Sequence, residues 1–179
     1  IPLIDTIPEN RIHSVIIQTN ERYNYLFRDK ILKVFYIQNS VSFDSKPLKQ
    51  KKLSNTLIFN GTASSPFGVF YFLDFLNAYS NQFTGVIKGA VLSDTRKEIN
   101  SKYDSLIKKG KLIMDDAYIE SKYLTNYVSA YEIGICFYDI ESLTKNRFNY
   151  LSAPSVTMFT YFSLGVPFVG SYFPVLLFI

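Results

Sequence analysis

The sequence contains very few of the residues that most often act in catalysis. There is one cysteine, Cys136, one histidine, His13, and no tryptophan. A single cysteine excludes a disulfide within the chain, which is typical of proteins in a reducing compartment. The chain also lacks the GxGxxG, GxxxxGK[ST] and GxSxG motifs, so a standard dinucleotide fingerprint, a P-loop and an α/β-hydrolase elbow are all missing. We therefore set hydrolase chemistry aside.

The two rare residues have ordinary structural interpretations. Cys136 falls inside a predicted buried strand, where a lone cysteine more often packs than attacks a substrate. His13 would be the default general base of an enzyme, but it precedes a short strand far from the main loops, which favours a surface or capping role. The segment Ile1 to Asn10 has no basic region followed by a long apolar run, so no signal peptide is expected. Because there is no initiator methionine, we expect the chain to begin inside a longer polypeptide.

The composition is that of a globular protein. A chain of 179 residues, 47% hydrophobic, allows one domain or one domain with an appendage. The net charge of +4 fits an anionic ligand or a membrane surface, and fits a solvated lysine-rich surface equally well. Lysines cluster at Lys46 to Lys52 and around Lys108 to Lys111 without interleaved aromatics, so no nucleic-acid partner is expected. The last 22 residues, Met158 to Ile179, are uncharged, but two glycines and two prolines favour a buried helix, turn and strand over a membrane span.

The first part of the chain predicts a small α/β unit. A strand is expected over His13 to Gln18, then a helix over Asn20 to Asp29 capped by Thr19, then a strand over Lys33 to Gln38. The polar residues 45–54 include Pro47 and read as a linker. The chain thus divides into an N-terminal unit (1–44), a linker (45–54) and a main domain (55–179).

The main domain alternates strands and helices. Strands are expected at Thr56 to Phe59, Thr84 to Leu92, Lys111 to Met114 and Ile133 to Tyr138, with a further strand after Pro167. Between them lie a helix from Pro66 to about Tyr79, a charged helix from Ser93 or Asp94 to Lys109, a helix from Ser121 to Ala130, and a short helix after Ser155. This alternation predicts an α/β, doubly wound, mostly parallel sheet with helices on both faces.

Two turns of this domain are candidate ligand sites. The turn containing Asn60, Gly61 and Thr62 follows a strand and precedes a helix, so its main-chain N–H groups could approach a phosphate. A tight turn that simply needs glycine is an equal alternative. The segment Asn149 to Thr160 gathers the hydroxyls of Ser152, Ser155 and Thr157 at a helix N-terminus, which suits a diphosphate, although plain N-capping also explains them.

Asp115 and Asp116 form the last candidate considered, as metal ligands or a base. Adjacent residues of a strand point to opposite faces, and no histidine or cysteine lies near them, so a metal site is disfavoured.

The stretch Tyr131 to Ser171 resembles a known family. It reads YEIGICFYDIESLTKNRFNYLSAPSVTMFTYFSLGVPFVGS and resembles the donor-binding half of GT-B glycosyltransferases, whose pattern is "adigi … N … P-S-K-x-x-E-Y-x-a-x-G-x-P-v-i". The segments HSVIIQTNER and KVFYIQN resemble the end of the family's acceptor domain, and YIESKYLTNYVSAYEIGICFY resembles its loop, helix and strand. The resemblance covers about His13 to Ser171 and implies a Rossmann-like donor domain preceded by the remnant of an acceptor domain.

The resemblance also implies site residues and partners. Carried over by position, Asn60, Gly61 and Thr62 would lie near the diphosphate of a nucleotide-sugar, and Tyr118 near the base. The remaining implied donor-binding residues are Tyr138, Asn149, Ser152, Ser155, Thr157 and Thr160. No metal cofactor is expected, because main-chain amides and a helix dipole would stabilise the leaving diphosphate. The implied acceptor is a glycan or a lipid-linked glycan in bacterial surface polysaccharide synthesis, on the cytoplasmic side, with peripheral membrane contact left open.

Two positions depart from the family pattern. Val156 or Thr157 stands at the position of the family's lysine, and Thr160 stands where a glutamate holds the ribose hydroxyls. Losing hydrogen bonds to that carboxylate, about 1.5–3 kcal/mol each, would weaken nucleotide binding. We therefore interpret the chain as a glycosyltransferase fragment, inactive alone if its missing half is required. A degenerate binding module and a membrane-associated interaction protein stay as alternatives.

Overall fold

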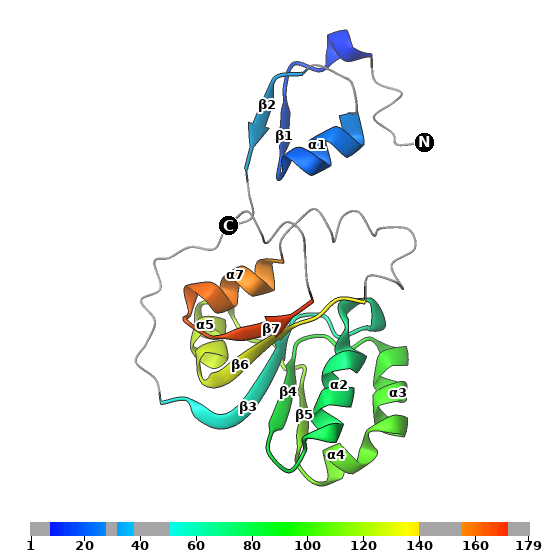
Figure 1. Ribbon diagram of the computed structural model, residues 1–179, viewed down its shortest axis with the longest axis vertical. Coiled ribbons are helices and arrows are strands. Elements are labelled where there is room, and N and C mark those ends of the chain that lie inside the picture. The colour runs from blue at the N-terminus through cyan, green and yellow to red at the C-terminus, as the bar shows by residue number, and fades with distance from the viewer. Residues whose placement is uncertain (1–7, 28–31, 38–50, 140–154, 172–179) are drawn as a thin grey trace.

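The computed structural model describes residues 8–27, 32–37, 51–139 and 155–171 (Figure 1). The first two ranges form a small unit: a 3-10 helix, η2 (Glu9–Arg11), a strand, β1 (Val15–Ile17), a helix, α1 (Asn20–Phe27), and a strand, β2 (Val34–Tyr36). β1 and β2 pair in parallel. The predicted cap is confirmed, because the Arg22 N–H donates to Thr19 Oγ1 at 3.2 Å.

The main domain contains a five-stranded sheet in the order β5-β4-β3-β6-β7. Its strands are β3 (Leu53–Asn60), β4 (Thr84–Lys88), β5 (Leu112–Asp115), β6 (Tyr131–Cys136) and β7 (Phe168–Gly170). Every pair of neighbours is parallel. The chain builds outward from β3 in one direction and then returns to build outward from β6 in the other, which is the doubly wound arrangement.

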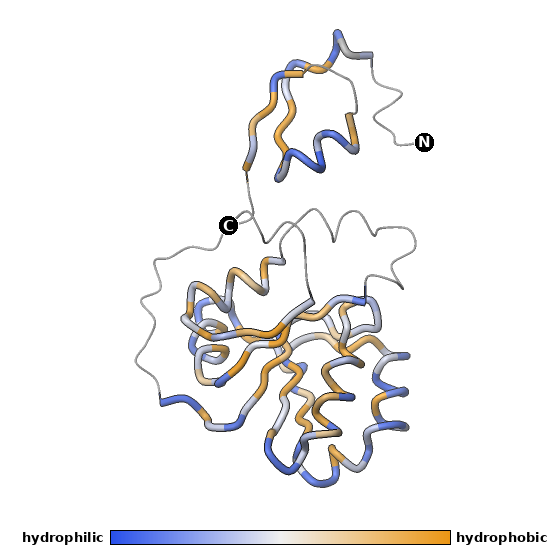
Figure 2. The backbone as a smooth tube through the Cα atoms, in the orientation of Figure 1, coloured by the Kyte–Doolittle hydropathy of each residue, from blue (hydrophilic) through white to orange (hydrophobic). Residues whose placement is uncertain are grey.

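Helices cover both faces of this sheet (Figure 1). One face carries η3 (Ser65–Phe67), α2 (Val69–Ala78), α3 (Ser93–Lys102) and α4 (Asp104–Lys108), and the other carries α5 (Ser121–Ser129) and α7 (Val156–Ser163). Successive side chains of β3 point to opposite faces of the sheet. Leu57 and Phe59 pack on the face covered by α2, whereas Ile58 packs with Val128 and Tyr161 on the face covered by α5 and α7. Figure 2 shows hydrophobic residues along the central strands and α2, with α3 largely hydrophilic. The predicted fold class is confirmed.

Two predicted helices are each divided in the structure. The helix expected from Pro66 to Tyr79 is a 3-10 turn followed by α2, separated by Gly68 at φ 66°. A Cβ at Gly68 would lie 2.6 Å from the Phe137 Cβ, so the residue that follows β6 leaves no room for a side chain at this position. The helix expected up to Lys109 divides at Tyr103, which turns inward and is buried between α3 and α4.

Some predicted strand boundaries were also wrong. β4 ends at Lys88 rather than Leu92, because Gly89 leaves the strand at φ 128° and lies against the main chain of Gly61. β6 lies two residues earlier than expected, at Tyr131–Cys136. β3 begins at Leu53, so the last two residues of the expected linker belong to the sheet. Of the rest of that linker, Lys51 and Lys52 directly precede β3, and residues 45–50 lie outside the described residues.

The segment predicted as helix, turn and strand near the C-terminus has that structure as far as residue 171. α7 ends at Ser163, Gly165 follows at φ 61°, and β7 starts at Phe168. Within the described ranges, no helix is both long and apolar enough to cross a membrane.

Candidate functional site

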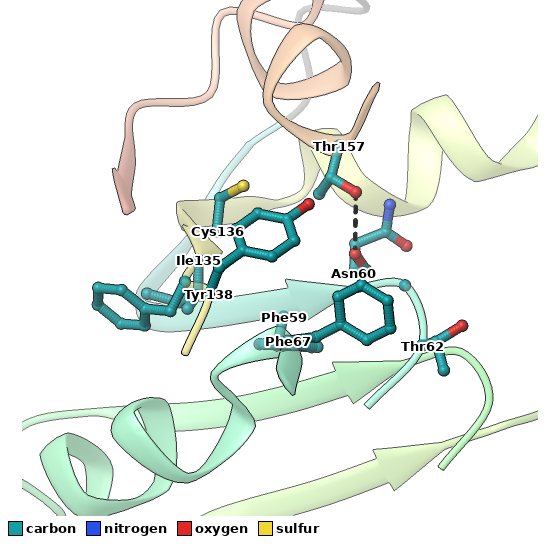
Figure 3. Close-up of a pocket in the computed structure, with 10 residues that line it drawn as sticks. Phe59, Asn60, Thr62, Phe67, Ile135, Cys136, Tyr138 and Thr157 are labelled. Atoms are coloured by element: carbon teal, nitrogen blue, oxygen red, sulfur yellow. Dashed lines mark hydrogen bonds between the residues drawn. The ribbon is translucent and has the colours of Figure 1, made fainter. Parts of the chain in front are cut away.

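A pocket lies where the winding of the sheet reverses. β3 leads to α2 on one face, and its neighbour β6 precedes α7 on the other, so the carboxyl ends of these two strands open between the helix layers. In open α/β sheets, ligands bind at this topological switch point. The pocket has a volume of about 110 Å³ and is lined by Phe59, Asn60, Gly61, Thr62, Phe67, Ile135, Cys136, Phe137, Tyr138 and Thr157 (Figure 3).

The turn after β3 forms one side of the pocket. Gly61 has φ 129°, a conformation that favours glycine, and its N–H donates to the Lys88 carbonyl oxygen at 2.9 Å. The carbonyl oxygen of Gly61 would lie 2.4 Å from a Cβ placed on Gly89. The two glycines therefore let the turns after β3 and β4 contact each other. The tight-turn interpretation of this segment is confirmed, and the same turn lines the pocket.

The first turn of α7 forms the opposite side. Ser155 is the N-cap, and its Oγ accepts a hydrogen bond from the Thr157 N–H at 3.2 Å. Thr157 Oγ1 donates to the Asn60 carbonyl oxygen at 3.4 Å, and Figure 3 shows this side chain pointing from α7 toward the end of β3. The N-capping interpretation of Ser155 is thus confirmed, while Thr157 joins the helix to the turn.

Aromatic side chains close the third side. The rings of Phe67 and Tyr138 meet edge to face, with centroids 5.8 Å apart. The main chain of Tyr138 is held firmly, because its N–H donates to Ser171 Oγ at 2.9 Å and Ser171 Oγ donates back to its carbonyl oxygen at 3.0 Å. The next N–H, of Asp139, donates to the Pro66 carbonyl oxygen at 3.0 Å. The pocket wall at Tyr138 is therefore fixed from β7 and from η3.

Tyr161 lies behind the pocket and was not singled out from the sequence. Its side chain is fully buried, and its hydroxyl accepts from the Asn60 N–H at 3.2 Å. The hydroxyl lies 2.9 Å from the carbonyl oxygen of Ile58 and 3.3 Å from that of Ile135. Burial raises the pKa of this phenol above its ordinary value, so it is a neutral donor at physiological pH.

The structure does not bring every predicted site residue to the pocket. Tyr118 follows β5, is 89% exposed and does not line it. Thr160 also lies outside the lining, and its hydroxyl donates to the Val156 carbonyl oxygen of its own helix at 3.0 Å. Asn149 and Ser152 lie outside the described residues.

Asp115 and Asp116 have separate partners, as expected for neighbours along a strand. Asp115 Oδ1 accepts from Lys88 Nζ at 2.9 Å and Oδ2 from the Tyr127 hydroxyl at 2.7 Å. Asp116 pairs with Arg96 at 2.6 Å on the surface. No group of three or more metal-ligating side chains occurs in the described part of the chain.

Lys88, the last residue of β4, is a buried charged residue whose ammonium group has several partners. Besides Asp115, its Nζ donates to the Ala117 carbonyl oxygen at 2.7 Å and lies 5.0 Å from the centre of the Tyr127 ring. No charged residue is among those that line the pocket.

The two rare residues also have positions in the structure. Cys136 is buried at the end of β6, and burial raises the pKa of its thiol, with a hydrogen bond to Ser155 acting the other way. The thiol is therefore protonated at neutral pH, which agrees with a packing role. His13 is exposed and lies two residues before β1.

The chain matches no protein-family profile and no curated protein in sequence. Its fold is similar to that of solved glycosyltransferases. The pneumococcal O-GlcNAc transferase GtfA, in complex with UDP and GlcNAc, is 13% identical with a TM-score of 0.62, and the match covers 92% of this chain and 31% of GtfA. A TarM variant of S. aureus, in complex with UDP and other ligands, is 12% identical with a TM-score of 0.62, over 93% of this chain and 32% of TarM.

A third structure is an α-glucosyltransferase in complex with UDP-glucose and DNA containing an abasic site. It is 13% identical with a TM-score of 0.59, and the match covers 94% of this chain and 47% of that enzyme. The fold of this chain is thus similar to part of these glycosyltransferases, in agreement with the family resemblance of the sequence. The chain spans about a third to a half of the length of these three structures.

Proposed function

We propose that this chain is the donor-binding part of a glycosyltransferase and that its switch-point pocket holds part of a nucleotide-sugar. The observation that carries the proposal is the juxtaposition of the Asn60–Thr62 turn with the N-terminus of α7, bridged by Thr157. A glycine-containing turn and a helix N-terminus both present main-chain N–H groups, which favour an anionic ligand. The similar structures contain UDP or UDP-glucose, which supports the same ligand class.

The size and lining of the pocket suggest how much of the donor it holds. Its volume of about 110 Å³ is well below the roughly 300–1,000 Å³ of a pocket for a whole drug-sized ligand. Its lining offers hydroxyl and amide groups from Asn60, Thr62 and Thr157 beside aromatic rings. We infer that it receives one part of the donor, next to the diphosphate, with main-chain amides in place of a metal ion.

For the complete protein, we propose transfer of the sugar to a glycan or lipid-linked acceptor in surface polysaccharide synthesis. This transfer would take place on the cytoplasmic side of the membrane. The named α-glucosyltransferase was solved with DNA. A DNA acceptor is the competing outcome, and it would be detected by sugar incorporation into DNA by the complete protein.

Thermal unfolding with UDP, GDP, CMP and dTDP, each with and without Mg²⁺, tests the donor site. A nucleotide at about a hundredfold its Kd should add about 2.7 kcal/mol of stability, or about 5–11 °C in Tm for a chain of this size. We expect one nucleotide to give this shift without Mg²⁺. No shift with any of the four would contradict the proposal.

A pair of variants tests whether the nucleotide binds in the pocket. Thr157→Val removes the hydroxyl that bonds to Asn60, and Thr125→Val makes the same change on α5, outside the pocket lining. We expect Thr157→Val to weaken nucleotide binding by about 2- to 12-fold, the value of one hydrogen bond, and Thr125→Val to leave it unchanged. Equal effects would place the site elsewhere.

A further inference from the structure

Tyr161 makes a set of contacts that neither the sequence motifs nor the proposed function explains. Its ring comes from α7 and its hydroxyl meets main-chain groups of two strands, Ile58 and Asn60 in β3 and Ile135 in β6. A phenol has one proton, so the hydroxyl donates to one carbonyl at a time, the nearer being Ile58 at 2.9 Å, and accepts from Asn60.

These contacts lie at the end of the pairing between β3 and β6, where the two strands separate. β3 and β6 pair as far as Phe59 and Ile135, and beyond that point no further residue pair joins them. The Gly61 N–H donates on the β4 side to the Lys88 carbonyl oxygen, and the Asn60 N–H, on the β6 side, donates to the Tyr161 hydroxyl. The tyrosine hydroxyl therefore adds hydrogen bonds to the main chain of both strands at the opening that forms the pocket.

The sequence makes room for this side chain at Gly134. A Cβ at that position would lie 2.6 to 2.7 Å from three carbons of the Tyr161 ring. Real Cβ atoms do not come so close to ring carbons, so the ring can lie against β6 only because residue 134 is glycine. Gly134 and Tyr161 thus form a matched pair.

Tyr161 and Thr157 hold the same pocket residue. They are four residues apart on α7, one turn, and therefore share a face of the helix. Thr157 Oγ1 bonds to the carbonyl oxygen of Asn60, and the Tyr161 hydroxyl bonds to its N–H. These two hydrogen bonds hold the start of α7 at a fixed distance from the turn after β3. The two segments are the polar sides of the pocket.

We propose that Tyr161 is a positioning residue for ligand binding, whose hydroxyl fixes Asn60 and the N-terminus of α7 in the arrangement that the ligand contacts. The inference rests on the proposed function, since it concerns the same pocket. Tyr161 lies outside the pocket lining and acts through Asn60 and Thr157. A purely structural tyrosine would change the stability of the protein and leave the affinity of the folded protein unchanged.

The test compares two variants with the same chemical change. Tyr161→Phe removes the hydroxyl behind the pocket. Tyr103→Phe removes the hydroxyl that bonds to Asp74, in the core cluster on the α2 side of the sheet. Affinity for UDP, GDP, CMP and dTDP is measured by calorimetry at a temperature where both variants are folded, and amide hydrogen exchange is followed at Asn60 and Gly61.

We expect Tyr161→Phe to lose at least tenfold in affinity for the nucleotide that binds the wild type, and to exchange the Asn60 amide at least tenfold faster. Tyr103→Phe should stay within twofold of the wild type in both measurements. Affinity retained by folded Tyr161→Phe would overturn this inference and leave the proposed function standing. A wild type that binds none of the four nucleotides would overturn the proposed function, and this inference with it.

A second variant applies if Tyr161→Phe does not fold. Gly134→Ala keeps the hydroxyl but pushes the ring away from β6, and Gly110→Ala is its control, because nothing lies within 4 Å of a Cβ there. We expect Gly134→Ala to weaken nucleotide binding at least fivefold and Gly110→Ala to leave it unchanged. Equal affinities in the two folded variants would overturn the positioning role.

Discussion

Replacing Asp115 with asparagine removes the charge that faces buried Lys88. The Lys88 side chain is 5% exposed and the Asp115 side chain 25%, and their charged atoms are 2.9 Å apart. Breaking a buried pair from one side costs about 3–5 kcal/mol, because the other charge stays buried. Since Asp115 keeps some contact with solvent, we expect a loss of about 3 kcal/mol in the free energy of unfolding, or about 6–12 °C in Tm.

The neighbouring residue supplies a matched control. Asp116→Asn is the same chemical change one position later, but Asp116 is 57% exposed and its partner Arg96 is 36% exposed. Exposed ion pairs are worth about 0–1 kcal/mol, so this variant should lose less than about 1 kcal/mol. Urea unfolding of both variants measures the difference. Equal losses would refute the argument from burial.

The same pair predicts a dependence on pH. Burial acts to raise the pKa of Asp115, but hydrogen bonds from Tyr127 and Lys88 and the Lys88 charge outweigh it, so the pKa lies below its ordinary value of 3.8. A carboxylate with a lowered pKa in the folded state stabilises the fold above pH 3.8, and this contribution is lost as the pH falls below that value. The difference in stability between wild type and Asp115→Asn should therefore shrink below about pH 4. A difference that stays constant down to pH 2 would contradict this assignment.

Three further changes test the packing around the pocket. Gly134→Ala should lose about 1–3 kcal/mol by urea unfolding, because its Cβ would meet the Tyr161 ring at 2.6 Å, and no loss would contradict the close contact. Gly68→Ala should lose more stability than Gly110→Ala, since both have φ 66° but only Gly68 faces Phe137, and equal losses would count against that contact. Ser155→Ala should lose about 1 kcal/mol with its N-cap bond, measured by thermal unfolding, whereas an unchanged Tm would mean that the cap bond adds nothing.

Local features of the fold could be predicted from the sequence. The Asn60-Gly61 turn and the Ser155 cap depend on residue types within a few positions of one another, so their chemistry is visible in the chain itself. The alternation of strands and helices likewise predicted the parallel sheet and its two helical layers. The family resemblance then directed attention to the strand ends at which the pocket lies.

Features that depend on distant residues could not be predicted. Gly68 lies against Phe137, far along the chain, and Gly89 lies against the main chain of Gly61, so neither position has room for a side chain. Tyr161 matches the tyrosine of the family pattern, but nothing local indicates its partners in β3, which are about a hundred residues away. Pairing over such separations leaves no local periodicity to detect.

The donor-site role of Thr160 stays a prediction of the family resemblance. The family pattern places it at the ribose, and in this structure its hydroxyl bonds within α7 and it lies outside the lining of the pocket. Tyr161, the next residue, has the closer connection to the pocket through Asn60. The pattern directs attention to α7, and the three-dimensional contacts distinguish neighbouring residues on this helix.

The most direct test of the donor site is a titration of the ¹⁵N-labelled protein with UDP, followed by amide chemical shifts. At 20.6 kDa the chain is small enough for assignment of its amides by NMR. We predict that the largest changes occur at Gly61, Thr62 and Thr157, saturate together, and do not require Mg²⁺. Saturable changes confined to residues away from the ends of β3 and β6 would contradict the placement of the donor in this pocket. No changes at millimolar UDP, GDP, CMP or dTDP would contradict the proposal of a nucleotide-sugar ligand.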